Sequence, residues 1–262
     1  MSSLKFDLWK GDCLELMKDI PDGSIDTVLC DLPYGTTQCS WDNIIPFETM
    51  WEQLKRVVKQ NGVIALFGAE PFSSKLRCSN LKMFKYDWVW EKSKATGFLN
   101  SKKQPLRSHE IISVFYDKQP NYNPQMQLST PYNKGVRKEQ TDDDVYGSFS
   151  QVEVKNDTGL RYPRSVQYFK TAEHEGGFHK SQKPVALLEY LIKTYTQEAE
   201  TVLDFTAGSF STAIACLNTD RNFIGIELDG SYFDIGVNRI KEYIESNNMN
   251  VDLNLKYLTV KD

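Results

Sequence analysis

The sequence predicts an α/β fold in which helices cover both faces of a mostly parallel, twisted sheet. Short apolar runs typical of strands alternate with stretches in which apolar residues recur at helical spacing. Two of these runs, Ile25–Cys30 and Thr201–Leu203, lead directly into an acidic residue, the position where an open α/β sheet carries its chemistry. A chain of 262 residues can bury a sizeable core in one such domain without metals or disulfides.

The N-terminal part of the chain contains the first predicted helices and strands. Leu14–Ile20 is predicted to form a short helix that the turn Pro21-Asp22-Gly23 stops, and Ile25–Cys30 is predicted to form a buried strand. Phe47–Lys59 has helical spacing, and Asn61-Gly62 is predicted to end this helix. Three further strands are predicted at Val63–Phe67, Tyr86–Trp90 and Ile111–Tyr116.

The C-terminal part repeats the alternation of helix and strand. Pro184 is expected in the first turn of a helix over Val185–Tyr195, because proline fits that position without losing a hydrogen bond. The remaining predicted elements are a strand at Thr201–Leu203, a helix that begins near Ser211, a strand at Asn222–Ile226 and an amphipathic helix at Tyr232–Ile244.

Between these halves, residues 117–177 are rich in Pro, Asn, Gln, Gly and Asp and show little periodicity. Such a stretch inside an α/β pattern is typical of an insertion or a mobile arm. Five basic side chains in it could reach base edges or phosphates: Lys134, Arg137, Lys138, Arg161 and Arg164.

The distribution of charge indicates local contact with an anionic partner. The formal net charge is -4, which argues against a protein that coats nucleic acid indiscriminately. Residues 75–116 nevertheless hold nine Lys or Arg against three acids, and Lys or Arg bound to phosphate releases condensed counterions. The predicted DNA contacts in this segment are Lys94, Lys102, Lys103 and Arg107. A merely solvated basic surface is the alternative interpretation.

Cysteine and histidine usage indicates neither disulfides nor a metal site. The five cysteines are scattered, odd in number and contain no Cys-x-x-Cys pair, so a reducing cytoplasm is expected. His174 and His179 flank Glu175 and are interpreted as solvated side chains. Met1–Lys5 lacks a signal-peptide core, and no apolar run is long enough to cross a bilayer, so no membrane partner is expected.

The tetrapeptide Asp31-Leu32-Pro33-Tyr34 places an acid, a rigid kink and an aromatic ring together at the end of a predicted strand. A carboxylate accepts hydrogen bonds from an exocyclic amino group, and the proline fixes the backbone so that carbonyls point outward. The tyrosine ring offers a face for stacking on a base. These are the requirements of methyl transfer to an amino group on a base.

A second constellation begins with the strand that ends in Asp204 and continues through a small-residue loop to Thr212. The next predicted strand ends in Glu227. A glycine-containing turn lets the backbone approach a ligand, and an acid at the next strand tip can bind both ribose hydroxyls. The pattern therefore favours an adenosine-type cofactor site, with an ordinary turn beside a solvated Glu as the alternative.

Together these segments resemble the amino-group DNA methyltransferases that use S-adenosylmethionine, in the subgroup whose catalytic motif precedes the cofactor motif. Gly11-Asp12-Cys13 resembles the family's acidic turn near the cofactor adenine, and residues 31–34 resemble its catalytic Asp-Pro-Pro-Tyr. Residues 179–184 resemble the segment beside the methionine end of the cofactor. The resemblance implies cofactor contacts from Asp12, Cys13, Lys183, Pro184, Asp204, Phe205, Thr206, Ala207, Gly208, Ser209, Thr212 and Glu227.

The resemblance also implies a Rossmann-like methyltransferase fold with circularly permuted motif order, a single catalytic domain over 1–262 and target recognition by 117–177. The implied reaction is methylation of adenine N6 in a specific sequence of double-stranded DNA, with the base flipped out of the helix. Asp31 and the Leu32 carbonyl would accept from the amine while Tyr34 stacks on the base, without a metal or a covalent intermediate. A homodimer and a restriction endonuclease partner fit the family's habits, in a prokaryotic or virus-infected cell.

Rival functions stay open. A cytosine-N4 methyltransferase uses the same geometry but more often begins its tetrapeptide with Ser, so Asp31 favours adenine; an RNA substrate is a weaker alternative. Cytosine carbon methylation is disfavoured, since the chain contains no Pro-Cys dipeptide.

Two departures from the family pattern suggest a catalytically impaired DNA-binding relative. Leu32 replaces a proline, and Phe210 replaces a glycine, where its ring is expected to weaken cofactor binding. Trp41 and Phe67 are alternative stacking rings, although core positions are expected for both.

Overall fold

The computed structural model describes residues 3–35, 42–137, 150–175 and 182–258. It divides into two compact units, one formed by residues 1–123 with 165–262 and the other by Pro124–Arg164. None of the helices in the described ranges has both the length and the apolar character that crossing a membrane requires.

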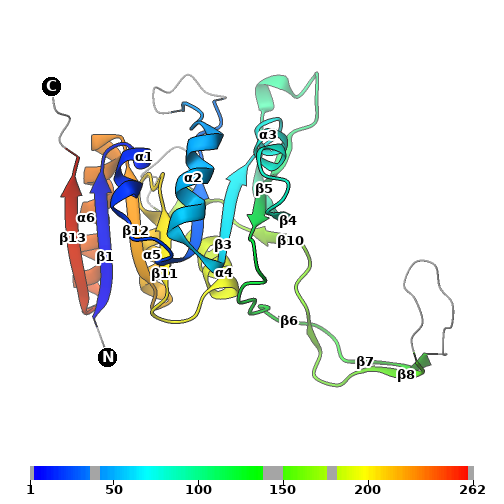
Figure 1. The fold of residues 1–262 in the computed structure, drawn as a ribbon. Helices are drawn as coiled ribbons and strands as arrows, with labels where there is room; N and C mark the ends of the chain where they lie inside the picture. The colour runs from blue at the N-terminus through cyan, green and yellow to red at the C-terminus, as the bar shows by residue number, and fades with distance from the viewer. Residues whose placement is uncertain (1–2, 36–41, 138–149, 176–181, 259–262) are drawn as a thin grey trace. The chain divides into compact units, whose positions relative to one another are not determined.

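The larger unit is built on a nine-stranded sheet with the order β10-β4-β5-β3-β2-β11-β12-β1-β13 (Figure 1). Only β5 runs antiparallel to its neighbours, β3 and β4, and every other pair in this sheet is parallel. The predicted mostly parallel α/β sheet is therefore confirmed. The strands are β1 (Leu4–Lys10), β2 (Ile25–Asp31), β3 (Val58–Gly68), β4 (Phe84–Thr96), β5 (Arg107–Phe115), β10 (Val166–Phe169), β11 (Thr201–Asp204), β12 (Asn222–Glu227) and β13 (Val251–Tyr257).

Helices cover both faces of this sheet, and a buried apolar cluster fills each side. One cluster joins the sheet to α1 (Cys13–Leu16), the following 3-10 turn η1 (Met17–Asp19), α2 (Phe47–Val57) and α3 (Phe72–Ser79). The other joins it to α4 (Val185–Tyr195), α5 (Ser211–Asn218) and α6 (Gly230–Ser246). Side chains alternate between the two clusters along each central strand, so that Leu29 faces the second while Val28 and Cys30 face the first.

β2 and β11 lie side by side and parallel, and the order in which the chain adds strands to the sheet reverses between them. From β2 the chain continues through α2 to β3 on one side, whereas from β11 it continues through α5 to β12 on the other. A crevice forms at the carboxyl ends of two strands whose connections leave in opposite directions. The fold thus places a site beside Asp31 and Asp204, the last residues of β2 and β11.

The boundary between α2 and β3 differs from the prediction. The helix ends at Val57, not at Lys59, and Asn61-Gly62 lies inside β3, which begins at Val58. Two β-branched residues in succession favour strand geometry, and Val58 pairs with Ile25 of β2. At Gly62 a Cβ atom would lie 2.8 Å from the Asp26 carbonyl oxygen, so the glycine permits close approach of two strands instead of ending a helix.

Several elements lie outside the predicted ones. In the larger unit these are α3, the strand β1, the two edge strands β10 and β13, and the short 3-10 turns η2 (Phe98–Asn100) and η3 (Ala172–His174).

The smaller unit, Pro124–Arg164, contains two antiparallel ribbons. β6 (Gln127–Leu128) pairs with β9 (Leu160–Arg161), and β7 (Tyr132–Arg137) pairs with β8 (Val152–Asn156). This unit is shorter than the insertion expected at 117–177, because β10 joins the main sheet next to β4.

Candidate active site

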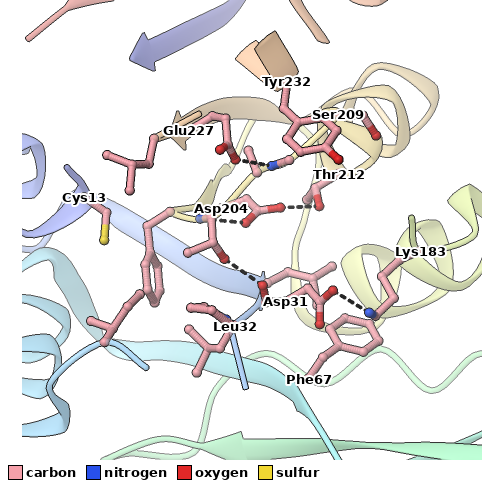
Figure 2. A pocket seen from close by; sticks show the side chains of 18 of the residues that line it. Cys13, Asp31, Leu32, Phe67, Lys183, Asp204, Ser209, Thr212, Glu227 and Tyr232 are labelled. Atoms are coloured by element: carbon pink, nitrogen blue, oxygen red, sulfur yellow. Dashed lines mark hydrogen bonds and ion pairs between the residues drawn. The ribbon is translucent and has the colours of Figure 1, made fainter. Parts of the chain in front are cut away.

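A cavity of about 290 Å³ opens at the carboxyl ends of β2, β11 and β12. Figure 2 shows the carboxylates of Asp31, Asp204 and Glu227 arranged around it, with Tyr232 of α6 at its rim. Backbone and side chains from the loop after β11 form one wall, and residues 43–46 after the tetrapeptide form another. Three acids from three strands therefore face one cavity close in size to small-molecule sites.

Asp31 is held by contacts on both sides of its carboxylate. The Tyr34 hydroxyl donates to Oδ1 at 2.6 Å, and the Lys183 ammonium forms an ion pair with Oδ2. The Thr206 hydroxyl donates to the Asp31 backbone carbonyl at 2.8 Å, which ties the loop after β11 to the end of β2. Burial raises the pKa of the Asp31 carboxyl above its usual value, and the charge on Lys183 opposes that rise.

Lys183 belongs to a chain of alternating charges beneath the cavity. Its Nζ atom lies 3.3 Å from Oε2 of Glu110 on β5, and Glu110 Oε1 forms an ion pair with Lys92 of β4. Burial raises the pKa of Glu110, but the two lysines more than offset it, so the pKa lies below its ordinary value. Burial lowers the pKa of Lys183, yet Asp31 and Glu110 raise it above its ordinary value. Two acids and two bases, none more than 21% exposed, thus neutralise one another.

The rest of the tetrapeptide is fixed by packing. Leu32 and Pro33 line the cavity, and the Leu32 side chain is 4% exposed within the apolar cluster that contains α2. The Tyr34 ring packs on Phe72 of α3, with 5.1 Å between ring centroids. Burial of the leucine side chain therefore anchors the loop at Leu32.

Asp204 closes the loop that follows β11. Oδ2 accepts from the Thr212 hydroxyl at 2.6 Å, and Oδ1 accepts from the Thr206 amide at 3.3 Å. The side chain is buried, and this burial raises the pKa of Asp204 to about 7. The loop from 205 to 210 is thus fastened at its start to the first turn of α5.

On the other side of the cavity, Glu227 and Asp12 accept hydrogen bonds from backbone amides. The Glu227 carboxylate accepts from the Gly208 amide at 2.7 Å and from the Asp229 amide at 2.8 Å. Each carboxylate oxygen can accept a second hydrogen bond, which leaves acceptor capacity for a ligand hydroxyl. Asp12 caps α1 by accepting from the Leu14 and Glu15 amides, and burial raises the pKa of the neighbouring Cys13 thiol to about 12.

Most residues predicted to bind the cofactor line this cavity: Asp12, Cys13, Lys183, Asp204, Phe205, Thr206, Ala207, Gly208, Ser209, Thr212 and Glu227. Pro184 is not part of the lining, because it lies buried at the N-cap of α4. Lys183 lines the cavity, although its ammonium pairs with Asp31. The structure therefore places it between the predicted cofactor and catalytic groups.

Several lining residues were not predicted as cofactor contacts, among them Phe67, Gln182, Leu228 and Tyr232. Phe67 is the penultimate residue of β3 and lies opposite Asp31 of β2, and Lys183 Nζ lies 5.3 Å from its ring centroid. Tyr232 follows Glu227 closely in the first turn of α6, so its position after the strand tip was a usable signal. Glu110 lacked any local signal, because a single acid in an apolar strand indicates no partner.

The expectation that Phe210 crowds the cofactor is wrong. Phe210 has a left-handed backbone, with φ of 59°, and its ring is fully buried against Phe223 and Phe233 instead of lining the cavity. A Cβ atom at Gly225 or Gly236 would lie 2.6 or 2.2 Å from this ring. The two glycines therefore make a socket that takes the ring away from the site.

The predicted DNA contacts fall in two places. One place is the hairpin between β4 and β5, which consists of the end of β4, residues 97–106 and the start of β5. It carries Lys94, Lys102, Lys103 and Arg107, all exposed, and Lys94 pairs with Glu173 at 2.8 Å. In the smaller unit Lys134 and Arg164 are exposed, and the Arg161 guanidinium lies 4.2 Å from the Tyr132 ring centroid. Lys138, Trp41, His179 and the side chains of Arg137 and His174 lie outside the described part of the structure.

Among the described residues, no group of three or more His, Cys, Asp or Glu could hold a metal.

Comparison with known proteins gives consistent matches. The sequence profile of a DNA methylase family matches residues 25–238. The chain is 26% identical over 264 residues to the type II methyltransferase M2.MboI of Moraxella bovis, and this alignment covers 90% of this chain and 88% of that protein. It is 26% identical over 254 residues to the DNA adenine methyltransferase YhdJ of Escherichia coli, covering 88% and 81%.

Solved structures confirm the fold. The cytosine-N4-specific PvuII DNA methyltransferase aligns with a TM-score of 0.66 at 14% identity, over 97% of this chain and 96% of that one. The M1.HpyAVI complex with SAM aligns with a TM-score of 0.62 at 21% identity, over 90% and 98%.

Replacing Phe210 with glycine should destabilise the protein without improving cofactor binding. Loss of a buried phenylalanine ring costs about 3–5 kcal/mol, and relief of the left-handed backbone returns about 1–2 kcal/mol. We expect a net loss of about 2–3 kcal/mol in urea unfolding and an affinity for S-adenosylmethionine within about twofold of wild type. Phe233→Ala, on ordinary helical backbone, is the matched control and should cost more. A sharp rise in affinity would contradict the assigned position of the ring.

The raised pKa of Asp204 predicts a pH-dependent stability. Because the folded-state pKa is about 7 against an ordinary 3.8, the folded protein holds this proton more tightly than the unfolded chain does. The resulting stabilisation is complete below about pH 4 and is lost as pH rises through 7, a change of the order of a few kcal/mol. Urea unfolding at several pH values should show this loss in wild type and in the exposed control Asp234→Asn, but not in Asp204→Asn. Parallel curves for all three would contradict the prediction.

Proposed function

This chain belongs to the DNA methylase family, and we propose that it methylates the exocyclic N6 of adenine in a specific sequence of double-stranded DNA. The activity shared by the family is transfer of a methyl group from S-adenosylmethionine to an amino group of a DNA base. The adenine target, the recognition of one sequence and the roles of individual residues are the proposed parts.

One observation carries the proposal. The Asp31 carboxylate and the loop from Asp204 to Thr212 face the same cavity, and the Thr206 hydroxyl joins them through the Asp31 carbonyl at 2.8 Å. An acid that can bind an amine therefore lies beside a loop that can hold an adenosine-type cofactor. Positioning two reactants in this way removes much of the entropic barrier to their reaction.

Adenine is favoured over cytosine by the acid itself and by one relative. The tetrapeptide begins with Asp31, whereas cytosine-N4 enzymes of this type more often begin with Ser. The relative YhdJ is named a DNA adenine methyltransferase. Cytosine-N4 methylation is the second candidate, because the PvuII enzyme shares the fold and acts on cytosine.

The residues present fit S-adenosylmethionine. Glu227, whose carboxylate keeps acceptor capacity beyond its backbone donors, would bind the ribose hydroxyls, and the backbone of 205–209 would lie along the rest of the cofactor. Asp12 and Cys13 would contact the adenine end. When bound, the cofactor supplies an electrophilic methyl group on a sulfonium.

Asp31 would act on the target amine. Its two oxygens already accept from Tyr34 and Lys183, and each retains one further acceptor position for an amine N–H. As the amine nitrogen bonded to the methyl carbon and the methyl–sulfur bond broke, leaving its electron pair on sulfur, positive charge would grow on the nitrogen and the fixed Asp31 carboxylate would stabilise it. The surplus proton then leaves the nitrogen toward Asp31. Lys183 keeps Asp31 ionised and oriented, since an ammonium beside a buried carboxylate favours its charged form.

A duplex DNA substrate requires further residues that hold the extruded base and recognise the target sequence. The base must leave the stack to reach the cavity. The Tyr34 ring, which is held in place by the hydrogen bond from its hydroxyl to Asp31, would stack on that base. The Pro124–Arg164 unit, with exposed Lys134 and Arg164, is the proposed target-recognition element. A homodimer, a restriction endonuclease partner and a cytoplasmic location stay predictions.

The function is tested by incubating the protein with labelled S-adenosylmethionine and unmethylated genomic DNA, followed by mass analysis of the nucleosides. N6-methyladenine is the expected product, and N4-methylcytosine would favour the second candidate. Asp31→Ala should abolish transfer and leave cofactor affinity nearly unchanged, because the carboxylate acts on the amine. Asp31→Asn, which keeps the shape of the side chain and an oxygen that accepts from Lys183, controls for misfolding caused by loss of that contact. Transfer at the wild-type rate by both variants would exclude the assigned role.

Glu110 is expected to act as a positioning residue for Lys183. In Glu110→Gln the Lys183 ammonium loses one of the two carboxylates that raise its pKa, so it deprotonates at lower pH. We expect kcat to fall about tenfold with little change in KM for S-adenosylmethionine, the loss of roughly one charge-assisted hydrogen bond. The alkaline limb of the pH–rate profile should shift to lower pH, and Glu110→Asp should restore part of it. An unshifted limb would indicate a purely structural role.

A further inference from the structure

The hairpin between β4 and β5 carries apolar side chains at an exposed tip. Phe98 and Leu99, in the 3-10 turn η2, are 79% and 99% exposed, and every residue from Thr96 to His109 is exposed. Gly97, with φ of 91°, begins this turn. Exposure of two adjacent large apolar side chains at one tip costs solvation energy, which indicates that they contact something the isolated chain lacks.

The hairpin rises from the active-site edge of the sheet. β4 is parallel to β10 and β5 is antiparallel to both β4 and β3, so β4 ends at the same edge as β2 and its Asp31. Figure 1 shows this hairpin projecting from the edge at which β3 ends. Lys92 and Glu110, which extend the ion-pair chain from Asp31, lie at its base. Phe98 follows Lys92 by six positions, which span about 20 Å at most in extended chain.

The surroundings of the tip are basic. Lys102, Lys103 and Arg107 fall in the stretch from 95 to 109, which contains no Asp or Glu, whereas Lys92 and Lys94 nearer the base pair with Glu110 and Glu173. Lys102, Lys103 and Arg107 are exposed beside the apolar pair. An apolar tip framed by cations on one edge of an active site matches duplex DNA, whose phosphates bind the cations while its stacked bases accept apolar side chains.

We propose that Phe98 and Leu99 form a wedge that enters the base stack of the DNA and holds the duplex open while the target base occupies the cavity. This inference rests on the proposed function, since it requires a base that leaves the helix. Removing a base from the stack costs a few kcal/mol and leaves a gap between its neighbours. The wedge fills that gap with apolar surface, and Lys102 and Lys103 hold the hairpin on the flanking phosphates.

The test compares a paired target with one that is already open. A synthetic duplex carries the methylated sequence, mapped beforehand by sequencing of methylated genomic DNA, with the target base either paired or opposite an abasic site. The variants are Phe98→Ala with Leu99→Ala, and Leu81→Ala as control. Leu81 is 65% exposed and precedes β4, at the opposite edge of the sheet.

The double variant should lose about tenfold or more in kcat/KM on the paired duplex, and about twofold on the open one, since the open target needs little unstacking. Leu81→Ala should match wild type on both. The salt dependence of DNA binding should be unchanged in the double variant, whereas Lys102→Ala should reduce its slope by about one phosphate contact.

Other outcomes would overturn the wedge. Equal losses on both duplexes would show that the tip acts in some step other than base opening, and no loss on either would show that it does not enter the stack. A change from dimer to monomer in sedimentation of the double variant would assign the apolar pair to contact between two copies of this chain. Failure of the wild-type protein to methylate either duplex would instead overturn the proposed function, and the wedge with it.

Discussion

The parallel pairing of β2 with β11 is the constraint on which the site depends. Val202 lies opposite Thr27 and Leu203 opposite Val28, so two strands far apart in the sequence end together at Asp31 and Asp204. Because their connections leave in opposite directions, no helix covers the space beyond these ends, and a cavity opens there. The bond from Thr206 to the Asp31 carbonyl then fixes the loop on one strand against the acid on the other.

The chain of charges from Asp31 through Lys183 and Glu110 to Lys92 links the cavity to the edge of the sheet. Buried ions cost several kcal/mol each in desolvation, so this chain is tolerable only because acids and bases alternate and no charge is left over. The residues come from β2, the segment before α4, β5 and β4. The same contacts that orient Asp31 therefore also fix the base of the β4–β5 hairpin.

Phe210 shows how a departure from a family motif can be accommodated at a distance. A phenylalanine in left-handed backbone is strained, yet its ring gains full burial in a socket that exists only because Gly225 and Gly236 lack side chains. Gly225 lies on β12 and Gly236 on α6. The loop beside the cavity keeps its course, so this substitution gives no reason to regard the chain as an impaired relative.

The sequence by itself determined the α/β class, the strands ending in Asp31, Asp204 and Glu227, and the helix after Pro184, because periodicity and turn residues act over a few neighbouring positions. It also identified most of the cavity lining, since those residues belong to short contiguous motifs. Only the tertiary structure decided the end of α2 at Val57, the strands β1, β10 and β13, the pairing of Lys183 with Asp31 and Glu110, and the direction of the Phe210 ring. Each of these depends on a strand or side chain distant in the sequence, and local propensity carries no information about such partners.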